Sequence, residues 1–328
     1  MKKIAVVILN WNGAKLLQQF LPSIIKYSDL AKIYVADNAS TDDSIEVLKN
    51  EFPEITIIKN NDNYGFAGGY NLALEQVEES YYALVNSDIE VTENWLDSIL
   101  ELFENEEATA IIQPKILDYK RKDYFEYAGA AGGFIDKYGY PFCRGRIFDS
   151  VEKDFGQYND EKEIFWASGA CFFIRKDVFR TLNGFDSSFF AHQEEIDLCW
   201  RAFNLGYKAK YTSKSVVYHL GGATLNDANP KKTYLNFRNS LLMLTKNLPK
   251  NKIFSVIFIR MVLDGLAAIQ FIFKGNFSHF LAVLKAHFVF YHLIYKVLQN
   301  RSGAKKENYY YKKSIVFSYF IKNGKVFE

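Results

Sequence analysis

The sequence predicts an α/β fold in which helices flank a mostly parallel sheet, followed by a C-terminal helical appendage. Up to about residue 115, short β-branched runs alternate with helical stretches, which is typical of βα units on a parallel sheet. From residue 231 onward the pattern is long, apolar and helical. The chain has 328 residues, about twice the roughly 150-residue prior for one domain. We therefore expect an α/β domain over 1–230, with halves 1–115 and 116–230, and a tail over 231–328.

The individual elements follow from periodicity and from the residues that break it. Pro22 interrupts the first helical stretch, and a dense group of N-cap residues between Ser40 and Ser44 begins the second. We expect strands over 3–9, 33–36, 55–58, 81–86, 124–128 and 164–174. We expect helices over 14–27, 45–52, 66–77 and 93–105, from about Asp197, and over 252–273 and 279–298.

Composition places the chain among globular proteins of a reducing compartment. Apolar residues make up 49% and charged residues 24%, close to globular averages, which argues against a disordered or fibrous chain. The three cysteines form neither a CxxC pair nor a disulfide framework. The apolar run near the N-terminus is shorter than a signal-peptide core and lacks a small-residue cleavage site. We expect a cytoplasmic protein.

Charge is unevenly placed along the chain and points to an anionic partner for the tail. Residues 251–328 carry 12 basic and 3 acidic groups, a net charge of +9, whereas residues 1–250 carry 28 basic and 35 acidic groups, a net charge of −7. Arg260 and Asp264 lie near the centre of 253–273, and a central charge costs about 2.5–3.5 kcal/mol on insertion scales. We therefore disfavour a membrane span.

Helices lying in the membrane interface fit the tail's Phe, Tyr and flanking Lys and Arg residues better. The aromatic-basic cluster Tyr309 to Lys313 adds to this pattern. The alternatives are a helical cap with a solvated basic surface, or a homodimer interface. We expect the protein at the inner face of the cytoplasmic membrane, on an anionic surface, with no nucleic-acid partner.

Polar residues follow three of the predicted strands: Asn10-Trp11-Asn12, Asp37-Asn38 and Asn86-Ser87-Asp88. Each could be an ordinary turn, but in an open parallel sheet ligands bind beyond the carboxyl ends of the strands. Together they predict one ligand-binding edge. The glycines of the stretch 65–71 do not form GxGxxG after a strand, and the chain has no GxxxxGK[ST]. Dinucleotide-binding and P-loop sites therefore lose their main support.

Two acidic groups are candidates for chemistry. Asn86 and Asp88 are two apart in an extended segment, so they point the same way and could hold a hard divalent cation; the alternative is a capping Asp. Glu194, Glu195 and Asp197 precede a helical stretch. They could simply be an acidic cluster that the helix dipole stabilises. If two adjacent glutamates are partly buried, however, burial and mutual repulsion would raise the pKa of one carboxyl group towards the range of a general base. His219 is either a structural hydrogen-bonder or a ligand.

The ordered segments VVILNWNG, VADNASTDDS, NYGFAGGYN, LVNSDIEV, SGACFFIRKDVFRTLNGFDSSFF, EEIDLCWRA and YHLGG resemble family 2 glycosyltransferases, in particular the rhamnosyltransferase-like enzymes of bacterial surface-polysaccharide assembly. The resemblance covers roughly residues 3–225. It implies a GT-A fold, a nucleotide-sugar donor, a Mg²⁺ or Mn²⁺ ion and inversion at the anomeric carbon.

The resemblance also implies roles for individual residues. Asp37 would contact the base or ribose, with Asn38 and the Asn10–Asn12 loop beside it. The turn under the nucleoside and diphosphate would be shaped by Asn63, Gly65, Ala67 and Gly69. Asn86 and Asp88 occupy the two ends of the family's DxD motif, with Asp88 holding the metal, and His219 would be a second metal or diphosphate ligand.

The family's catalytic base is usually an Asp, and here Glu195 occupies its position, so the base is either Glu195 or Glu194. Trp166 and Asp197 would lie on the acceptor side. The function implied is inverting transfer of a sugar, from dTDP-rhamnose or a UDP-hexose, to a hydroxyl of a glycan or polyprenyl-linked acceptor. The alternatives are a non-catalytic nucleotide-sugar or carbohydrate-binding module decayed from the family, and a related nucleotidyltransferase, against which the EExDLCWR segment argues.

Overall fold

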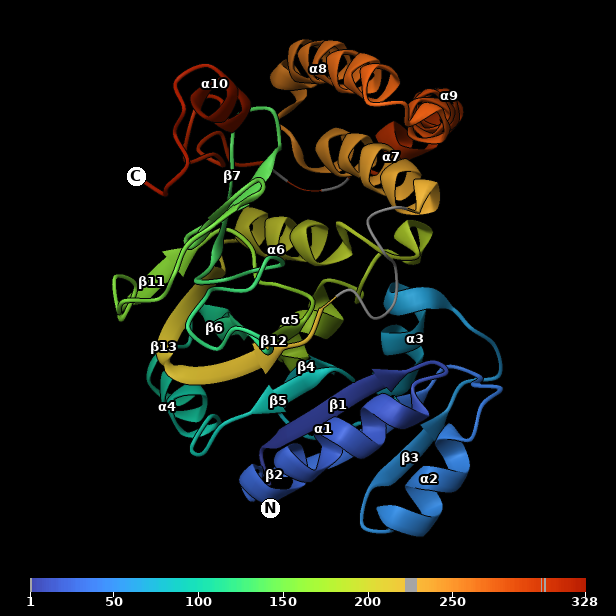
Figure 1. The fold of residues 1–328 in the computed structure, drawn as a ribbon, viewed down its shortest axis with the longest axis vertical. Coiled ribbons are helices and arrows are strands. Elements are labelled where there is room, and N and C mark those ends of the chain that lie inside the picture. Colours follow the sequence, from blue (N-terminus) through green and yellow to red (C-terminus); the bar gives the residue numbers. More distant parts are fainter. Residues whose placement is uncertain (1, 222–228, 302, 304) are drawn as a thin grey trace.

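A large mixed sheet forms the centre of the molecule. The computed structural model describes residues 2–221, 229–301, 303 and 305–328. Within these residues the sheet has nine strands in the order β11-β13-β6-β12-β4-β1-β2-β3, with β5 paired to β13 (Figure 1). Strands β3, β2, β1 and β4 are parallel, and so are β6 and β13, whereas β12 runs antiparallel to both β4 and β6. The first half therefore supplies a parallel edge, as the sequence predicts.

The strands and helices have the following bounds. The strands of the large sheet are β1 (Ile4–Asn10), β2 (Ala31–Asp37), β3 (Thr56–Lys59), β4 (Tyr81–Asn86), β5 (Ile89–Val91), β6 (Thr109–Asp118), β11 (Glu161–Ile164), β12 (Cys171–Arg175) and β13 (Lys208–His219). The helices are α1 (Ala14–Tyr27), α2 (Ser44–Glu51), α3 (Gly65–Leu74), α4 (Asp97–Asn105), α5 (Lys176–Thr181), α6 (Glu194–Leu205), α7 (Pro230–Asn247), α8 (Ile253–Phe273), α9 (Phe277–Gln299) and α10 (Ile315–Phe320).

Alternating side chains of the central strands build a core on each face of the sheet. Ile4, Val6 and Ile8 of β1 pack with residues of α1, α2 and α4 on one face. Ala5 and Val7 belong to the other core, which also takes in α3, α5, α6 and α7. This is the period-2 alternation expected of a strand buried on both faces, and it holds the strand ends rigidly in one line.

Residues 133–151 form a second, small sheet, which the C-terminal segment contacts. The strands β7 (Gly133–Ile135), β8 (Pro141–Cys143), β9 (Arg146–Ile147) and β10 (Ser150–Val151) form an antiparallel sheet. The chain end returns to it: Tyr311 N donates to Ile135 O at 2.9 Å, and the ring of Phe327 lies 5.1 Å from that of Phe134. This sheet could not be predicted from the sequence, because its strands are only two or three residues long.

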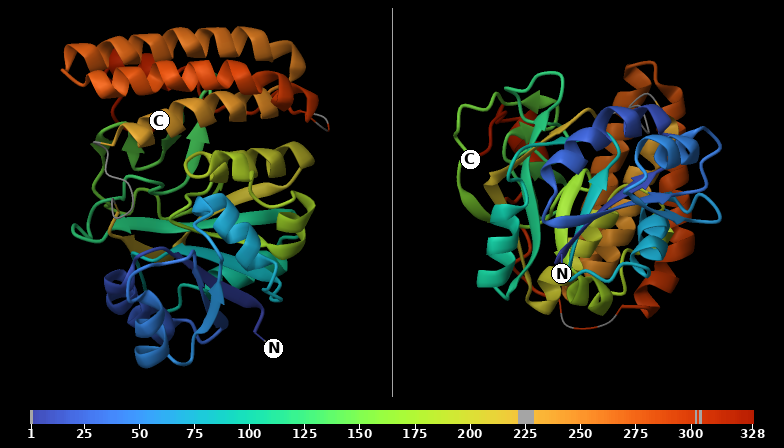
Figure 2. Two further views of the ribbon diagram at one scale, coloured as in Figure 1. Left: turned by 90° about the vertical axis from the view of Figure 1, so that its right-hand side faces the viewer. Right: turned by 90° about the horizontal axis from the view of Figure 1, so that it is seen from below.

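The tail helices stack in layers at one end of the molecule. Figure 2 shows α8 and α9 side by side across this end, with α7 between them and the large sheet. Leu241, Leu244, Val256 and Phe290 belong to the same core as the sheet residues, so the tail packs on the α/β part rather than standing apart. Among the described residues, α8 and α9 are long and apolar enough to cross a membrane by length and composition.

Several predicted elements differ from those observed. The predicted strand 124–128 is not one: Tyr124 and Phe125 make only isolated bridges, to Lys153 and Leu117. The predicted strand 164–174 is two strands, because the chain turns at Ser168-Gly169, where Ala170 N donates to Ser168 Oγ. Helix α4 begins four residues later than predicted, α3 ends three earlier, and α6 begins at Glu194 rather than near Asp197.

Candidate active site

The three predicted polar strand ends meet at one edge of the sheet. In the strand register, Asn10 at the end of β1 is opposite Asp37 at the end of β2, and Leu9 is opposite Asn86 at the end of β4. Asn10 and Asp37 are buried. The sequence therefore placed these side chains correctly, since carboxyl ends of neighbouring parallel strands converge.

Hydrogen bonds hold the loops at this edge in one arrangement. Asn10 Nδ2 donates to Asp37 Oδ1 at 3.0 Å and to Ser40 Oγ at 3.2 Å, and Ser40 N donates to Asp37 Oδ2 at 3.0 Å. Asn12, at a φ of 52°, accepts from Thr41 N at 2.7 Å. Asn10 Oδ1 is buried and has no hydrogen-bond partner. This oxygen faces Gly13, where an added Cβ would lie only 2.4 Å away.

Asn38 joins the strand edge to the start of α3. Its Nδ2 donates to Asn63 Oδ1 at 3.1 Å and to Gly65 O at 3.0 Å. Gly69 on α3 allows this close approach, since a Cβ there would lie 2.9 Å from Asn38 Nδ2. Ala67, in the first turn of α3, is fully buried. The predicted turn residues are thus brought together beside Asn38, with small side chains where the elements touch.

Asp88 lies just beyond β4, in a chain of acidic and basic groups. Its Oδ1 is 3.2 Å from His219 Nε2 at the end of β13, and His219 Nδ1 is 3.2 Å from Glu126 Oε1. All three are buried. Burial alone would lower the pKa of His219, but the carboxylates of Glu126 and Asp88 outweigh it and raise that pKa to about 10. Glu126 was not a candidate in the sequence, because nothing local marks it.

These groups can hold a divalent cation only together with a ligand. Within the described ranges, no group of three or more His, Cys, Asp or Glu side chains is arranged to bind a metal. Asp88 supplies the oxygen ligand that a hard cation prefers, and such ions commonly combine one or two carboxylates with phosphate oxygens. Asp88 and His219 therefore fit a cation that a diphosphate also binds. Such a cation would replace the proton between the two side chains.

Glu194 and Glu195 open helix α6 with unpaired carboxyl oxygens. Each has one buried Oε2 without a hydrogen-bond partner. Burial, and then the neighbouring Glu195 carboxylate, raise the pKa of Glu194 well above its usual value. Burial raises the pKa of Glu195 to about 7. Glu195 is the more exposed of the two, and it lies beside Gly169, where an added Cβ would be 3.8 Å from Glu195 Cδ.

Glu195 is close to the strand-end edge in the fold. Gly169 precedes Ala170, whose carbonyl accepts from Asn86 N at 2.9 Å. A single turn of the chain before β12 therefore contacts both the Asn86–Asp88 segment and the glutamate. Two carboxyl groups therefore lie near this turn: that of Asp88, which is paired with His219, and that of Glu195, which has an unpaired oxygen.

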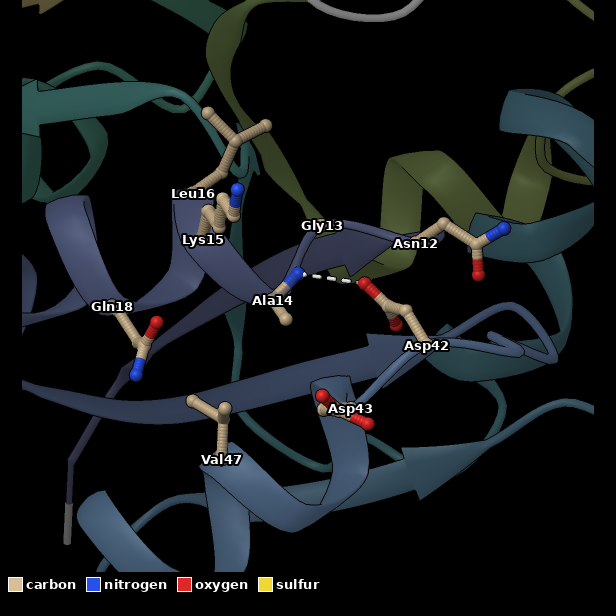
Figure 3. A pocket seen from close by; sticks show the side chains of 9 residues that line it. All are labelled: Asn12, Gly13, Ala14, Lys15, Leu16, Gln18, Asp42, Asp43 and Val47. Atoms are coloured by element: carbon tan, nitrogen blue, oxygen red, sulfur yellow. Dashed lines mark hydrogen bonds between the residues drawn. The ribbon is translucent and has the colours of Figure 1, made fainter.

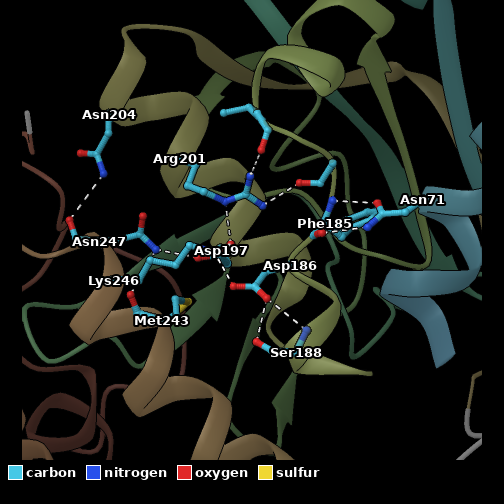
Figure 4. A network of polar contacts seen from close by, with 12 residues as sticks. Asn71, Phe185, Asp186, Ser188, Asp197, Arg201, Asn204, Met243, Lys246 and Asn247 are labelled. Carbon is cyan, nitrogen blue, oxygen red and sulfur yellow. Dashed lines mark hydrogen bonds and ion pairs between the residues drawn. The ribbon is translucent and has the colours of Figure 1, made fainter. Parts of the chain in front are cut away.

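Asp197 and Trp166 have structural partners away from this edge. Asp197 is fully buried and accepts from Arg201 Nε at 2.7 Å, Lys246 Nζ at 2.9 Å and Asn247 Nδ2 at 2.7 Å (Figure 4). The cations outweigh burial and keep its pKa below the ordinary value. Trp166 Nε1 donates to Phe134 O at 2.8 Å. Asp197 thus faces α7, and contact of either residue with an acceptor stays a prediction.

A surface pocket of about 440 Å³ lies next to the edge, between α1 and α2 (Figure 3). The first N–H group of α1 faces it, but Ala14 N already donates to Asp42 Oδ2 at 3.0 Å. Asp42 also accepts from Ser44 Oγ. Because these groups satisfy one another, we assign the pocket no role.

Comparison with known proteins agrees with this geometry. The model of the family "Glycosyl transferase family 2" matches residues 5–182. An N-acetylglucosaminyl-diphospho-decaprenol L-rhamnosyltransferase of Mycobacterium tuberculosis is 23% identical over 258 residues, covering 71% of this chain and 83% of the relative. The low-salt glycan biosynthesis hexosyltransferase Agl10 of Haloferax volcanii is 23% identical over 249 residues, covering 73% and 74%.

Solved structures show the same fold at low identity. GalNAc-T7 with UDP, GalNAc and Mn²⁺ superposes with a TM-score of 0.60 at 15% identity, over 77% of this chain and 49% of that one. The mannosyltransferase PcManGT of Pyrobaculum calidifontis, in complex with GDP-Man and Mn²⁺, gives 0.54 at 12% identity, over 88% and 87%. The fold is GT-A, and the family match spans more than half of the sequence. The chain belongs to glycosyl transferase family 2.

Proposed function

We propose that the protein is an inverting, metal-dependent glycosyltransferase. It transfers a sugar from a nucleotide-diphosphate donor, dTDP-rhamnose or a UDP-hexose, to a hydroxyl of a glycan or polyprenyl-linked acceptor in surface-polysaccharide biosynthesis. The observation that carries the proposal is the meeting of the polar strand ends with a buried, unpaired glutamate pair across one turn of chain. The rhamnosyl and hexosyl relatives support the choice of donors.

On the donor side, the nucleoside lies against the ends of β1 and β2. Asp37 is already oriented by Asn10 and Ser40. Asn38 holds the Asn63–Gly65 turn, which supports the nucleoside and diphosphate. Such preorganisation lowers the ordering cost of binding.

On the acceptor side, Glu195 removes the proton from the attacking hydroxyl. A buried carboxyl with a pKa of about 7 is partly ionised near neutral pH and has a strong tendency to take a proton, which suits a general base. Glu194 alongside it keeps its proton more tightly, so the pair shares one charge. Glu195 is favoured over Glu194 because it is less buried and lies next to Gly169.

The sugar is inverted because the hydroxyl oxygen attacks the anomeric carbon from the face opposite to the departing diphosphate. The C–O bond to the diphosphate breaks as the new glycosidic bond forms, and the hydroxyl proton goes to Glu195. Asp88 and His219, 3.2 Å apart, would hold the diphosphate end, and a Mg²⁺ or Mn²⁺ bound there would neutralise the charge that develops on the leaving group. The Glu126 carboxylate, 3.2 Å from His219 Nδ1, supports the positive charge of the ring.

A donor panel tests this proposal. UDP, GDP and dTDP, each with Mn²⁺, are screened for a rise in the melting temperature of the full chain, because a ligand that binds only the native state stabilises it. We expect one diphosphate to raise it, and only with metal. The matching nucleotide sugar should then be hydrolysed slowly without an acceptor. Binding without hydrolysis or transfer would instead establish the non-catalytic binding module.

We further propose that α8 and α9 dock on an anionic membrane surface. The outer faces of the two helices carry large exposed apolar side chains, among them Phe254, Phe258, Val262, Leu266 and Phe273 of α8 and Phe277, Leu284, Phe288, Tyr291 and Tyr295 of α9. Contiguous apolar faces of this kind are unusual on a soluble monomer and mark an interaction site. Figure 2 shows both helices lying across the end of the molecule, which suits insertion in the plane of the interface.

The two charges that count against a membrane span face the protein. Arg260 Nε donates to Asp264 Oδ1 at 2.8 Å, and Tyr140 OH donates to the same oxygen at 3.1 Å. Both ionic groups are buried. The outer face is therefore free of these charges, while the pair fastens α8 to the turn between β7 and β8. A spanning orientation would have to break this attachment, whereas in-plane docking keeps it.

The rim of this surface is basic. Lys274, Lys285 and Lys296 lie on or beside the two helices, and Asp264 is the sole acidic residue between 251 and 306 in the sequence. Lysines at such positions extend their ammonium groups towards anionic headgroups. This charge pattern favours a bilayer over a second copy of the chain, whose matching face would bring like charges together.

Vesicle flotation tests the membrane surface with a matched control. Phe254→Ser, Phe258→Ser and Phe273→Ser are combined in one variant, and Phe155→Ser, which removes an equally exposed Phe far from the helices, is the control. We expect the wild type and the control to float with phosphatidylglycerol vesicles and the triple variant to remain in solution. A wild-type dimer that ignores vesicles, and that the triple variant dissociates, would establish the dimer interface instead.

A further inference from the structure

The segment that leads into the two glutamates has a strained backbone. Phe190, His192 and Gln193 have φ values of 64°, 70° and 74°, in the left-handed region that non-glycine residues rarely adopt. Gln193 is the residue that directly precedes α6. Strain of this kind persists only where surrounding contacts determine the conformation, and it clusters at functional sites. We name residues 188–193 the pre-helix loop.

Helix α7 supplies the contacts that hold this loop. Asn239 is fully buried, and its Nδ2 donates to the carbonyls of Phe189 at 3.0 Å, Ala191 at 2.9 Å and His192 at 2.7 Å. The preceding residue, Arg238, donates through Nη2 to Ser188 O at 3.0 Å and to Phe189 O at 3.2 Å. Two adjacent residues of α7 thus bond the loop's backbone, independently of the loop's own side chains.

The other side of the loop contacts the start of α3. Phe190 O accepts from Phe66 N at 2.9 Å and from Ala67 N at 3.4 Å. These are among the first N–H groups of α3, which have no partner within the helix. Gly65, with a φ of +69°, permits the approach, because a Cβ there would lie 2.5 Å from Phe190 O. The loop is therefore bonded on one side to the donor-binding turn and on the other to the tail.

We propose that Asn239 is a positioning residue that sets the carboxyl of Glu195 relative to the donor-binding turn through the pre-helix loop. Asn239 itself contacts neither glutamate in its recorded hydrogen bonds, so it acts through the loop backbone. It lies beyond residue 182, where the family match ends, so the tail contributes to the catalytic arrangement. The inference rests on the proposed base role of Glu195.

The geometry explains why an Asn is needed here. Its Nδ2 serves three carbonyls, while its Oδ1 accepts from Arg238 Nε at 2.8 Å. An Asp has the same shape but no N–H donor, so it would place a carboxylate oxygen against three carbonyl oxygens. Loss of these bonds leaves buried acceptors unsatisfied and removes the support for the left-handed residues.

The test compares Asn239→Asp with Thr245→Val in the full-length protein. Thr245 is also buried on α7, but its hydroxyl bonds only Leu241 O within the helix, so its loss affects stability and not the loop. Turnover is measured as diphosphate release from whichever nucleotide sugar of the panel the wild type hydrolyses. Affinity for the matching nucleoside diphosphate with Mn²⁺, and amide hydrogen exchange over 188–195, are measured on the same samples.

We expect Asn239→Asp to lower kcat at least tenfold, to change diphosphate affinity less than threefold, and to speed exchange in the loop. Thr245→Val should leave all three unchanged. If Asn239→Asp does not fold, Arg238→Met removes two loop bonds from the less buried side and should show the same pattern at smaller size. Unchanged loop exchange and kcat would overturn the inference. A wild type that hydrolyses no donor would refute the proposed function instead, and loop exchange would still test the contact.

Discussion

The strand-end edge and the first turn of α6 both present carboxylates to the same region, but in opposite states. At the edge, both oxygens of Asp37 accept hydrogen bonds, and Asp88 is paired with His219. At α6, Glu194 and Glu195 each bury an oxygen that has no partner. Asp197, one turn further along the same helix, is again fully paired. Pairing, rather than burial alone, separates these groups.

The difference indicates a division of labour. Paired carboxylates are held in fixed positions by their partners, which suits them to orient a ligand or to hold a structural cation pair. Unpaired buried carboxyls have raised pKa values and can exchange a proton near neutral pH. The buried, unpaired state costs stability, and two adjacent carboxyl groups share it at the start of α6, which points to chemistry at that place.

The largest expected effect comes from removing the base. Glu195→Gln keeps the shape but cannot accept the proton, so turnover should fall by about 10²–10⁴-fold, the usual contribution of a general base. The melting temperature should not fall, since an unpaired buried carboxyl is removed. Glu194→Gln is the matched control and should lose less activity. Equal loss in both variants would mean that the pair acts as a unit; a larger loss in Glu194→Gln would reverse the assignment.

The next largest effect is expected at the other end of the donor. Asp88→Ala removes the carboxylate that we propose holds the diphosphate end, and loss of such electrostatic stabilisation commonly costs about 10²–10³-fold in rate. The Mn²⁺ requirement for diphosphate binding should weaken in parallel. Asp43→Ala, an exposed carboxylate on the outer side of the neighbouring loop, should be neutral. Near-normal turnover by purified Asp88→Ala would refute the metal assignment.

The edge could be predicted from the sequence, whereas the contacts of α6 could not. Strand ends are local: Asn10, Asp37 and Asp88 directly follow β-branched runs, and parallel pairing brings such positions together. Glu126 and Asn239 carry no local signal, because the groups they contact are far along the chain: the His219 ring is 93 residues from Glu126, and the His192 carbonyl is 47 residues from Asn239. The sequence also places Arg260 and Asp264 near the centre of a helix, but it does not show which side of that helix faces the protein. Packing decides this.

The pH dependence of activity should show the state of the glutamates. With the Glu195 pKa raised to about 7, kcat/KM should rise about tenfold per pH unit below pH 7 and level off above it. An ordinary glutamate would place this limb near pH 4.3. The profile is measured with saturating Mn²⁺ and the donor that the panel identifies. A limb below pH 5 would show that the carboxyl is solvated in the working enzyme.

As the pH rises, the unpaired Glu195 should lower the free energy of unfolding, whereas the paired Asp197 should raise it. The raised pKa of Glu195 means that its stabilising neutral form is lost as pH rises from about 4.5 to about 7. Glu195→Gln should therefore gain on the wild type over this window, by on the order of 2 kcal/mol. Because folding lowers the pKa of Asp197, its ionised form stabilises the folded protein at pH values above the unfolded pKa near 4. This stabilisation is lost in acid. Asp197→Asn should be destabilised at pH 7, and less so as the pH falls. Urea unfolding at pH 4.5 and pH 8 measures both, and equal signs would contradict the contrast.

The smallest effect is expected where the edge meets α3. A Cβ at Gly69 would lie 2.9 Å from both Asn38 Nδ2 and Leu9 Cδ1, so Gly69→Ala must displace Asn38 and with it the Asn63–Gly65 turn. Overpacking of this size costs about 1–3 kcal/mol, partly offset by the better helix propensity of Ala. We expect several-fold weaker diphosphate binding with kcat almost unchanged. Gly265→Ala in α8 has open space around the new methyl group and should raise the melting temperature without touching affinity. Calorimetric titration compares the two variants, and wild-type affinity in Gly69→Ala would show that Asn38 does not shape the donor site.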